Sequence, residues 1–416
     1  MRILMLSSTF PYPPSRGGTE IRTFNLLKYL HQKNHEVTLV TQRHQAVTDA
    51  EVEELRKWVS ELVVFPLPPE LQNRSGITGL LAKAKRFANS VAKAIPANVL
   101  YRYSPEIQAL VDGYVREQKC DAITCEHSVN EIYIRPEFRN RVNTVVDVHS
   151  SVYGWIRDHL EMGASQNALR DRLYLSFVLK RYEKRYCTKF SNIVVTTEDD
   201  RQEFLKLRPD IDIKVIPNGV DLDLFPYRSH DPGGHQLIFV GAMDASHNID
   251  AARFFALTVL PELQKRYPDA TFIIAGARPT ASVLELKNLP GVVVTGRVPS
   301  MAEYLHQSTV CVVPLRTGFG IKNKTLEAMA AGVPVVASDR GLEGLAVDEA
   351  GLPLRALRAN QPAEYVNAIC QLFENPQLRA ELSQNGRQLV ETEFTWETAG
   401  KRYEQVVISC PLIYSE

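Results

Sequence analysis

Apolar residues along this chain fall into two kinds of segment, short continuous runs and longer stretches with helical spacing. The first run covers 1–7, and a loop then closes on Gly17 and Gly18. Apolar residues next recur every three or four positions over 19–33, and a second run covers 36–42. Short apolar runs predict buried strands, and the helical spacing predicts an amphipathic helix. A strand–loop–helix–strand unit of this kind is typical of a doubly wound fold with a parallel sheet.

The same alternation continues along the rest of the chain. Further strands are predicted at 62–65, 122–124, 143–148 and 192–196, and mostly helical segments at 79–118 and 155–190. A second α/β series is expected to begin after Ile211. Its strands are predicted at 214–216, 236–240, 271–275, 292–295, 310–314 and 333–337, and its helices include 248–266 and 301–306. Turn-forming residues at 215–221 mark a hinge, and 362–407 is predicted to be helical with a break near 394–396.

The length of 416 residues exceeds what one hydrophobic core usually holds, so two domains are expected. We place an N-terminal Rossmann-like domain at 1–205, a C-terminal one at 206–390 and a final helical segment at 391–416. The 48 basic and 48 acidic residues balance, which argues against nucleic acid as a partner. The six cysteines are scattered without a CxxC pair, and no apolar stretch approaches the length of a membrane span. We therefore expect a cytoplasmic protein.

The most informative stretch follows the predicted strand at 310–314. This strand leads into a loop with Gly318 and Gly320, and a helix of small residues comes next. Such a loop lets the backbone approach a ligand closely, and the N–H groups at a helix N-terminus attract anions. Lys322 and Lys324 add cations at the same place. The carboxylate of the glutamate near the helix start, at position 327, can accept hydrogen bonds from the two hydroxyls of a ribose. Together these residues predict a site for a phosphate-bearing nucleotide.

Candidate chemistry in the first half of the chain is less specific. Gly17 and Gly18 lie where the first strand meets the first helix, at the carboxyl edge of the sheet where ligands bind. A tight turn explains this pair equally well, and no GxGxxG fingerprint follows the strand. His149 comes directly after a buried strand, so it either faces the same edge or is an ordinary surface histidine. Asp221 and Asp223 match a DxD metal pattern, but their context is that of a linker, and we expect no metal site.

A basic segment covers 82–93, with lysine or arginine at 83, 85, 86 and 93 and a modest apolar face. Two interpretations stay open for it. It is either the solvated face of a helix, or a peripheral contact with anionic lipid headgroups at the inner face of a membrane.

Together these features resemble the retaining glycosyltransferases of family 4, glycosyl transferases group 1, over nearly the whole chain. The segments that carry the resemblance are the glycine pair with the helix and strand after it, His149, the signature at 216–221, the motif of Glu327 with Gly332 and Pro334, and the segment 394–396. The resemblance implies the GT-B fold, in which two Rossmann-like doubly wound parallel-sheet domains face a deep cleft. It also implies that the C-terminal helix crosses back to the N-terminal, acceptor-side domain.

The chain departs from the family pattern at two places. The family pairs two glutamates in its most specific motif, but the first of them is replaced here by Phe319 or, if the glycines are aligned, by Thr317. The arginine and lysine that normally open the second domain are missing from 239–248. The sequence resembles a subgroup with a Gly-x-Gly-x-Lys-x-Lys-x-x-Glu loop, and we interpret Lys322 and Lys324 as the replacement for the missing cations.

The resemblance also implies roles for particular residues. His149, Lys322 and Glu327 are the expected catalytic group, with His149 near the transferred sugar. The residues expected to bind the donor and its phosphates are Gly17, Gly18, Gly241, Arg278, Arg297, Gly318, Gly320, Ile321, Lys322, Asn323, Lys324, Thr325 and Glu327. For Arg278 and Arg297, ordinary surface charge is the alternative.

The activity implied by the resemblance is hexosyl transfer from a nucleotide diphosphate sugar to a glycan, lipid-linked or small-molecule acceptor, as in polysaccharide biosynthesis. The anomeric configuration is expected to be retained by a front-side attack that needs neither metal nor cofactor. Two alternatives stay open. The chain could be a nucleotide-sugar 2-epimerase of the same two-lobed fold, although this activity needs carboxylates facing the sugar and the missing first glutamate argues against it. It could also be a non-catalytic GT-B partner in polysaccharide assembly, which the missing glutamate and the two missing cations suggest.

Overall fold

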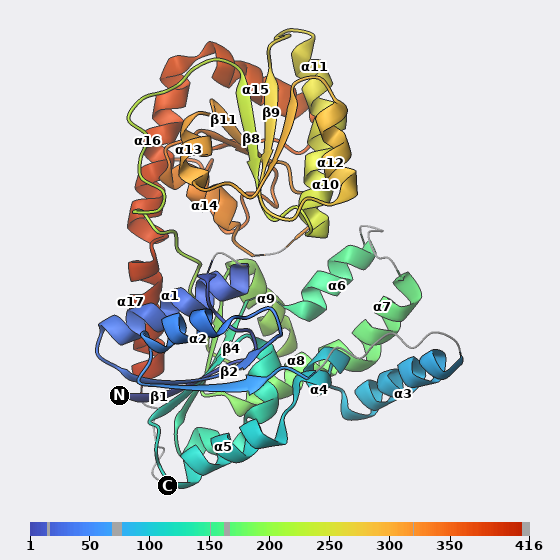
Figure 1. Cartoon of the computed structure of the whole chain (residues 1–416), viewed down its shortest axis with the longest axis vertical. Helices are drawn as coiled ribbons and strands as arrows, with labels where there is room; N and C mark the ends of the chain where they lie inside the picture. Colours follow the sequence, from blue (N-terminus) through green and yellow to red (C-terminus); the bar gives the residue numbers. More distant parts are fainter. Residues whose placement is uncertain (15–16, 69–76, 150, 162–166, 319, 410–416) are drawn as a thin grey trace. The chain divides into compact units, whose positions relative to one another are not determined.

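The computed structural model describes residues 1–14, 17–68, 77–149, 151–161, 167–318 and 320–409. The chain divides into two compact units, Met1–Ile216 with Ala399–Glu416, and Pro217–Thr398. Each unit contains one parallel sheet with helices around it (Figure 1). The sequence placed the first boundary at 205–206, whereas these units divide between Ile216 and Pro217.

The first unit is built on a seven-stranded sheet in the order β3-β2-β1-β4-β5-β6-β7, and all neighbouring strands are parallel. The strands are β1 (Arg2–Ser7), β2 (Glu36–Arg43), β3 (Glu61–Pro66), β4 (Ala122–Glu126), β5 (Asn143–Val148), β6 (Asn192–Val195) and β7 (Ile213–Val215). All residues of β4 and β5 are buried, as expected for central strands covered on both faces. The strand order reverses between β1 and β4, so their carboxyl ends flank the crevice where doubly wound sheets bind ligands.

Helices connect these strands and cover the sheet. They are α1 (Gly18–Gln32), α2 (Asp49–Arg56), α3 (Ile77–Lys93), α4 (Ala97–Arg102), α5 (Pro105–Arg116), α6 (Val152–Glu161), α7 (Ala168–Tyr174), α8 (Lys180–Tyr186) and α9 (Glu198–Leu207). Short 3₁₀ or π segments are η2 (Ser128–Tyr133), η3 (Pro136–Asn140), η4 (Leu175–Leu179) and η5 (Cys187–Lys189). The π turn η4 joins α7 and α8 into one helical run.

The second unit has a six-stranded parallel sheet in the order β10-β9-β8-β11-β12-β13. The strands are β8 (Gln236–Val240), β9 (Thr271–Ala275), β10 (Val292–Gly296), β11 (Val310–Val313), β12 (Val335–Ala337) and β13 (Leu357–Arg358). The helices are α10 (Ser246–Phe254), α11 (Leu260–Gln264), α12 (Ala281–Leu284), α13 (Met301–His306), α14 (Asn323–Ala330), α15 (Pro362–Glu374) and α16 (Pro376–Glu393), with η6 (Phe255–Val259) and η7 (Glu285–Asn288). The reversal of strand order lies between β8 and β11.

The last helix, α17 (Trp396–Ile408), packs on the first unit from Ala399 onward. Gly400 lies against the ring of Tyr29, because a Cβ on this glycine would be only 2.2 Å from the Tyr29 Cγ. The Tyr403 hydroxyl donates to the Glu126 carboxylate at 2.5 Å, and the Asn143 amide caps the carbonyls at the end of α17. The helix is therefore fixed by one close backbone contact and by buried hydrogen bonds.

The two segments where the chain passes between the units contact each other. Val220 donates its N–H to the carbonyl of Phe394 at 2.8 Å. A Cβ on Gly219 would lie 2.4 Å from the backbone nitrogen of Trp396. Position 219 therefore needs a glycine because a second segment of backbone passes directly over it.

The predicted fold class, two Rossmann-like doubly wound parallel-sheet domains, is confirmed. One strand was assigned to the wrong sheet. The strand predicted at 214–216 exists as β7, but it pairs with β6 in the first sheet and does not open the second series. The two-residue strand β13 was not predicted, because it is too short to produce a recognisable apolar pattern.

Candidate functional site

The carboxyl ends of β8 and β11 define the crevice of the second unit, because the strand order reverses between these two strands. Gly241 follows β8 directly, and Leu315 follows β11. The glycine loop begins after Leu315 and leads to α14. The anion site predicted from the sequence therefore starts at the edge of the sheet where ligands bind.

The loop before α14 uses two glycines in conformations that other residues rarely adopt. Gly318 has a φ of 107° and Gly320 a φ of 76°. Lys322 is the N-cap residue of α14 and makes no side-chain capping hydrogen bond. The helix N-terminus thus keeps the partial positive charge and the backbone donors that favour an anion.

Lys324 places a cation next to the end of β8. Its ammonium group donates to the Asn248 side-chain oxygen at 2.5 Å and lies 4.3 Å from the centre of the Phe239 ring. A Cβ on Gly241 would be 2.7 Å from the Lys324 Nζ, so the missing side chain makes room for this ammonium. Burial lowers the pKa of Lys324 to about 7, and the opposing effects of Cys311 and Glu327 are smaller. Lys324 is therefore partly neutral near neutral pH.

Glu327 lies one helical turn after Lys324 and is half-buried. Its carboxylate has no hydrogen-bond partner among the residues that the structure describes. Burial raises its pKa to about 7, because the surrounding protein disfavours the charged form more than Lys324 favours it. A ligand hydroxyl that donates to this carboxylate would therefore supply an interaction that the described protein groups do not.

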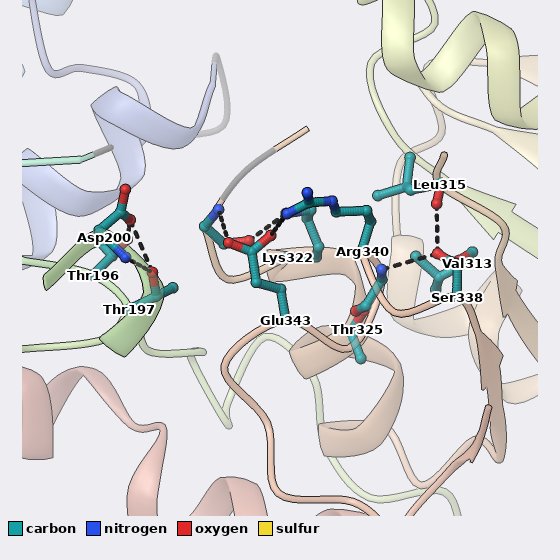
Figure 2. A network of polar contacts seen from close by, with 12 residues as sticks. Thr196, Thr197, Asp200, Val313, Leu315, Lys322, Thr325, Ser338, Arg340 and Glu343 are labelled. Atoms are coloured by element: carbon teal, nitrogen blue, oxygen red, sulfur yellow. Dashed lines mark hydrogen bonds and ion pairs between the residues drawn. The ribbon is translucent and has the colours of Figure 1, made fainter. Parts of the chain in front are cut away.

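Lys322 is held by a carboxylate that sequence reasoning missed (Figure 2). Its ammonium contacts the carbonyl of Gly320 and lies 3.3 Å from one oxygen of Glu343. The other oxygen of Glu343 accepts the N–H of Gly320 at 3.0 Å, and Arg340 lies 3.6 Å from the first. Glu343 is 4 % exposed. One buried carboxylate thus fixes both the loop backbone and the cation predicted to bind phosphate.

Further hydrogen bonds hold the ends of the loop. The Ser338 hydroxyl donates to the carbonyl of Leu315 at 2.5 Å and accepts the N–H of Gly341 at 3.1 Å (Figure 2). The Thr325 hydroxyl donates to the Gly341 carbonyl at 2.7 Å. Thr325, predicted as a phosphate ligand, thus ties α14 to the segment after β12.

Four other predicted donor residues have different surroundings. Asn323 accepts a hydrogen bond from Asn218 at 3.1 Å, and Ile321 is buried in the hydrophobic core of the unit. Arg278 lies in a left-handed conformation with a φ of 54°, and its guanidinium pairs with Asp244. Arg297 is exposed after β10. The structure brings Gly241 and Lys324 together with the loop, whereas the Ile321 side chain packs in the hydrophobic core.

In the first unit, the glycine pair lies at the N-terminus of α1, and His149 contacts the same turn. Gly17 is the N-cap residue, and as a glycine it has no side chain that could cap the helix. A Cβ on Gly18 would meet no atom of another described residue within 4 Å. The Thr19 hydroxyl lies 3.3 Å from the Nδ1 of His149. The first unit thus places the N-terminus of α1 beside an imidazole, and the Glu20 carboxylate lies against Gly17.

The surroundings of the His149 ring disfavour its charged form. Its Nε2 is buried, has no hydrogen-bond partner among the described residues, and lies 3.7 Å from the Asp147 carboxylate. The ring of His127 lies 5.1 Å away in an edge-to-face arrangement. Burial, together with His127 and Arg22, holds the pKa of His149 well below its usual range. A buried ring nitrogen of this kind is suited to bind a ligand group.

Two buried carboxyl groups near His149 are already engaged. Arg22 donates to both oxygens of Asp147, at 2.6 and 2.9 Å, and both residues are almost fully buried. Glu126 accepts from Tyr403, and burial with the nearby Asp147 charge raises its pKa to about 8. At neutral pH, therefore, Glu126 holds a proton and Asp147 is the partner of an arginine.

The DxD pattern at Asp221 and Asp223 forms a turn in the linker. Asp221 accepts the N–H groups of Asp223 and Leu224, as in an Asx turn, so its carboxylate shapes the linker. The described part of the chain holds no cluster of three or more His, Cys, Asp or Glu side chains suited to a metal. None of the helices drawn from those residues is long and apolar enough to cross a bilayer.

Comparison with known proteins supplies the context for these sites. Residues 16–224 match the family described as Glycosyltransferase Family 4, and residues 234–375 match Glycosyl transferases group 1. A phosphatidylinositol N-acetylglucosaminyltransferase subunit from Homo sapiens is 24 % identical, over 97 % of this chain and 75 % of that protein.

Solved structures extend the likeness to the fold. Sucrose-phosphate synthase of Thermosynechococcus elongatus superposes with a TM-score of 0.67 at 19 % identity, over 97 % of this chain and 98 % of that one. Anabaena HepE, solved in complex with UDP, superposes with a TM-score of 0.62 at 18 % identity, over 98 % and 99 % of the two chains. These likenesses identify the GT-B arrangement of Rossmann-like sheets.

Proposed function

Because this chain belongs to glycosyltransferase family 4 and transfers a hexosyl group from a nucleotide sugar, we propose that Lys322, Lys324 and the N-terminus of α14 neutralise the donor diphosphate. The observation that carries this proposal is the position of Lys324, whose ammonium lies beside Gly241 at the reversal of strand order. Anions favour this point because backbone donors, the helix dipole and a cation converge there.

The charge on the leaving group explains why these cations would matter for rate. When the glycosidic bond breaks, negative charge grows on the diphosphate, and preorganised positive groups stabilise that charge in the transition state. Lys322 is already held in place by Glu343 and by the Gly320 carbonyl. Little reorganisation is then needed during the reaction, and we propose that no metal ion is required.

The remaining groups fit the other parts of a nucleotide sugar. Glu327 would accept hydrogen bonds from the ribose hydroxyls, because its half-buried carboxylate interacts with Lys324 electrostatically but has no hydrogen-bond partner among the described residues. His149 would bind the transferred sugar through its buried Nε2. In the first unit, the N–H groups at Gly17 and Gly18 would contact the donor phosphates. The human relative is named for a phosphatidylinositol acceptor, and HepE binds UDP, which supports a lipid-linked acceptor and a uridine donor for this chain.

We propose retention of the anomeric configuration by front-side attack, in which the departing phosphate takes the proton of the acceptor. A double displacement would need a free carboxylate nucleophile near the sugar. The two carboxyl groups near His149 do not meet this need, because Asp147 is bound to Arg22 and Glu126 is protonated and bound to Tyr403. This arrangement supports the front-side route.

The partners that we propose for this reaction are a nucleotide diphosphate sugar and a glycan or lipid-linked acceptor. We also propose that the basic segment 82–93 contacts anionic lipid headgroups, since Lys85, Arg86 and Lys93 on it are exposed. Such a contact would place the enzyme at the membrane surface where lipid-linked acceptors lie.

The decisive experiment incubates the protein with a panel of UDP, GDP, ADP and dTDP sugars and follows release of nucleoside diphosphate. We expect Lys322→Ala and Lys324→Ala each to lower kcat at least about 100-fold. Glu327→Ala should weaken donor binding, and His149→Ala should lower kcat with little change in donor affinity. Lys287→Ala, at an exposed lysine far along the sequence from the loop, serves as the matched control.

Three results would contradict parts of the proposal. Near-normal turnover by both lysine variants would refute the diphosphate clamp. An inverted anomer in the product, seen by NMR, would refute retention. Loss of activity after EDTA treatment, restored by a divalent cation, would refute metal independence.

A further inference from the structure

Three large apolar side chains are exposed on one face of the helical run α7–η4–α8. Leu169 is 71 % exposed, Leu173 38 % and Phe177 50 %. They recur every four residues, which places them along one side of a helix. The other exposed large apolar side chains among the described residues are scattered over both units. A contiguous apolar stripe of this kind indicates a docking surface.

The exposed charges on this helical run are almost all positive. Arg170, Arg172, Lys180, Arg181 and Lys184 are exposed on the same helical run. The two acidic residues of this helical run do not balance these five cations. One is Asp171, which pairs with its neighbour at position 170, and the other is a buried glutamate at 183 bonded to Ser151 and Tyr153. The exposed face therefore combines apolar side chains with cations.

The helix α3 adds further cations at the same end of the first unit, where Figure 1 shows it beside α7. Phe87 of α3 packs against the Tyr174 ring at 6.2 Å, and Ser90 contacts the Tyr174 hydroxyl. The segment Ile77–Lys93 carries four basic residues and no acidic one. Lys85 and Arg86 are exposed, as are the cations of α7 and α8.

We propose that the stripe of Leu169, Leu173 and Phe177 inserts into the headgroup region of an anionic lipid bilayer, with the flanking cations on the lipid phosphates. The chemistry of the face selects this occupant. An apolar face with basic flanks matches a surface of acyl chains below anionic headgroups. A second copy of the chain would bring like charges together, because both faces would carry the same cations. The surface extends the lipid contact proposed above for 82–93, and it lies on elements that hold none of the proposed donor-binding residues, so it does not depend on glycosyl transfer.

Sedimentation with vesicles tests this proposal directly on the full chain. One set of vesicles contains phosphatidylcholine alone, and the other contains one part phosphatidylglycerol to two parts phosphatidylcholine. We expect binding to the anionic vesicles, little binding to the neutral ones, and weaker binding as salt is raised. The double variant Leu173→Ser/Phe177→Ser should lower the partition coefficient at least about tenfold. Arg172→Glu should lower it about fivefold or more, since each cation near an anionic surface contributes about that factor.

Two control variants distinguish the loss of this particular surface from the general effect of removing an exposed leucine or reversing an exposed lysine. Leu257→Ser removes an equally exposed leucine, and Lys287→Glu reverses an exposed lysine, both in the second unit. Both controls should bind vesicles as the unchanged chain does, and all variants should melt at similar temperatures. Equal binding by the Leu173→Ser/Phe177→Ser variant and the unchanged chain would overturn the proposal. So would equal binding to neutral and anionic vesicles. A dimer in sedimentation equilibrium that Phe177→Ser dissociates would also overturn it, because the occupant would then be a second copy.

Discussion

Donor binding should change the protonation state of Lys324. In the free protein, burial lowers the pKa of this ammonium to about 7. At pH 8 only about one in ten molecules then carries the charge. A diphosphate within about 4–6 Å favours the charged form and raises such a pKa by roughly 1–3 units. The ligand should therefore recruit a proton when it binds.

The size of the effect follows from these values. If the bound pKa of Lys324 reaches about 9, the protonated fraction at pH 8 rises from about 0.1 to about 0.9. Lys324 then takes up about 0.8 proton for each donor bound. Glu327 contributes the opposite effect at lower pH, because its pKa is raised to about 7 and ribose hydroxyls favour its carboxylate form. At pH 6 we therefore expect net release of a proton.

Calorimetry in pairs of buffers with different ionisation enthalpies measures this exchange, because the observed heat then includes the protons taken from the buffer. The ligand should be an analogue of the best donor in which a methylene replaces the glycosidic oxygen. Such an analogue is not hydrolysed, and its diphosphate has no terminal phosphate that titrates near pH 6. Lys324→Met should abolish uptake at pH 8, and Glu327→Gln should abolish release at pH 6. Lys287→Met is the control and should change neither.

The reasoning fails if the unchanged chain binds the analogue at pH 8 with no dependence on the buffer. Lys324 would then keep the same charge in both states and would not contact the diphosphate. Uptake that persists in Lys324→Met would also refute it, because another group would be the proton acceptor.

Three further predictions concern the supporting structure. Gly219→Ala should lower the free energy of unfolding, measured in urea, by at least about 2 kcal/mol, because the new Cβ would lie 2.4 Å from a backbone nitrogen. Gly113→Ala is the control: its Cβ would meet nothing closer than 3.9 Å, so this variant should be as stable as the unchanged chain. Gly400→Ala should cost about 2 kcal/mol and expose the tryptic sites of α17, since the new methyl would overlap the Tyr29 ring; an unchanged digestion pattern would contradict the docking contact. The folded protein keeps a proton on the Glu126 carboxyl up to a pKa of about 8, whereas the unfolded chain releases it near pH 4.5, so this group lowers the stability as pH rises from 4.5 to 8. Glu126→Gln should therefore reduce the dependence of stability on pH in this range. Identical pH profiles of thermal melting for this variant and the unchanged chain would show that Glu126 is already charged.

Most of the fold could be predicted because its signals are local. The strands at 143–148, 236–240 and 271–275 were predicted with the bounds that the structure shows. Central parallel strands are buried on both faces, so each appears in the sequence as one apolar run. The short strand β7 also has an apolar pattern, but its position along the chain does not reveal that it extends the first sheet. That assignment depends on tertiary packing.

The candidate site could be predicted only where its parts are close in sequence. The loop from Gly318 to Glu327 contains its glycines, cations and carboxylate within one continuous segment. Glu343 follows strand β12 in the sequence and reaches the loop only in the folded chain. The residues next to it in the sequence give no indication that it pairs with Lys322. The segment 239–248 lacks the usual cations, yet its last residue, Asn248, holds the ammonium of Lys324 in place. A hydrogen-bonded partner brought in by the fold leaves no pattern in the sequence.

The two lysines of the loop illustrate how a protein can keep positive charge for a ligand without a large cost to its own stability. An unpaired buried charge costs several kcal/mol, so a rigid pair of free ammonium groups would destabilise the folded chain. Lys322 avoids this cost because Glu343, itself almost fully buried, stays beside it. Lys324 avoids it differently, because its lowered pKa lets it lose its proton while the site is empty. Part of the positive charge that the diphosphate meets is thus created by binding, so donor affinity should fall as pH rises above about 7.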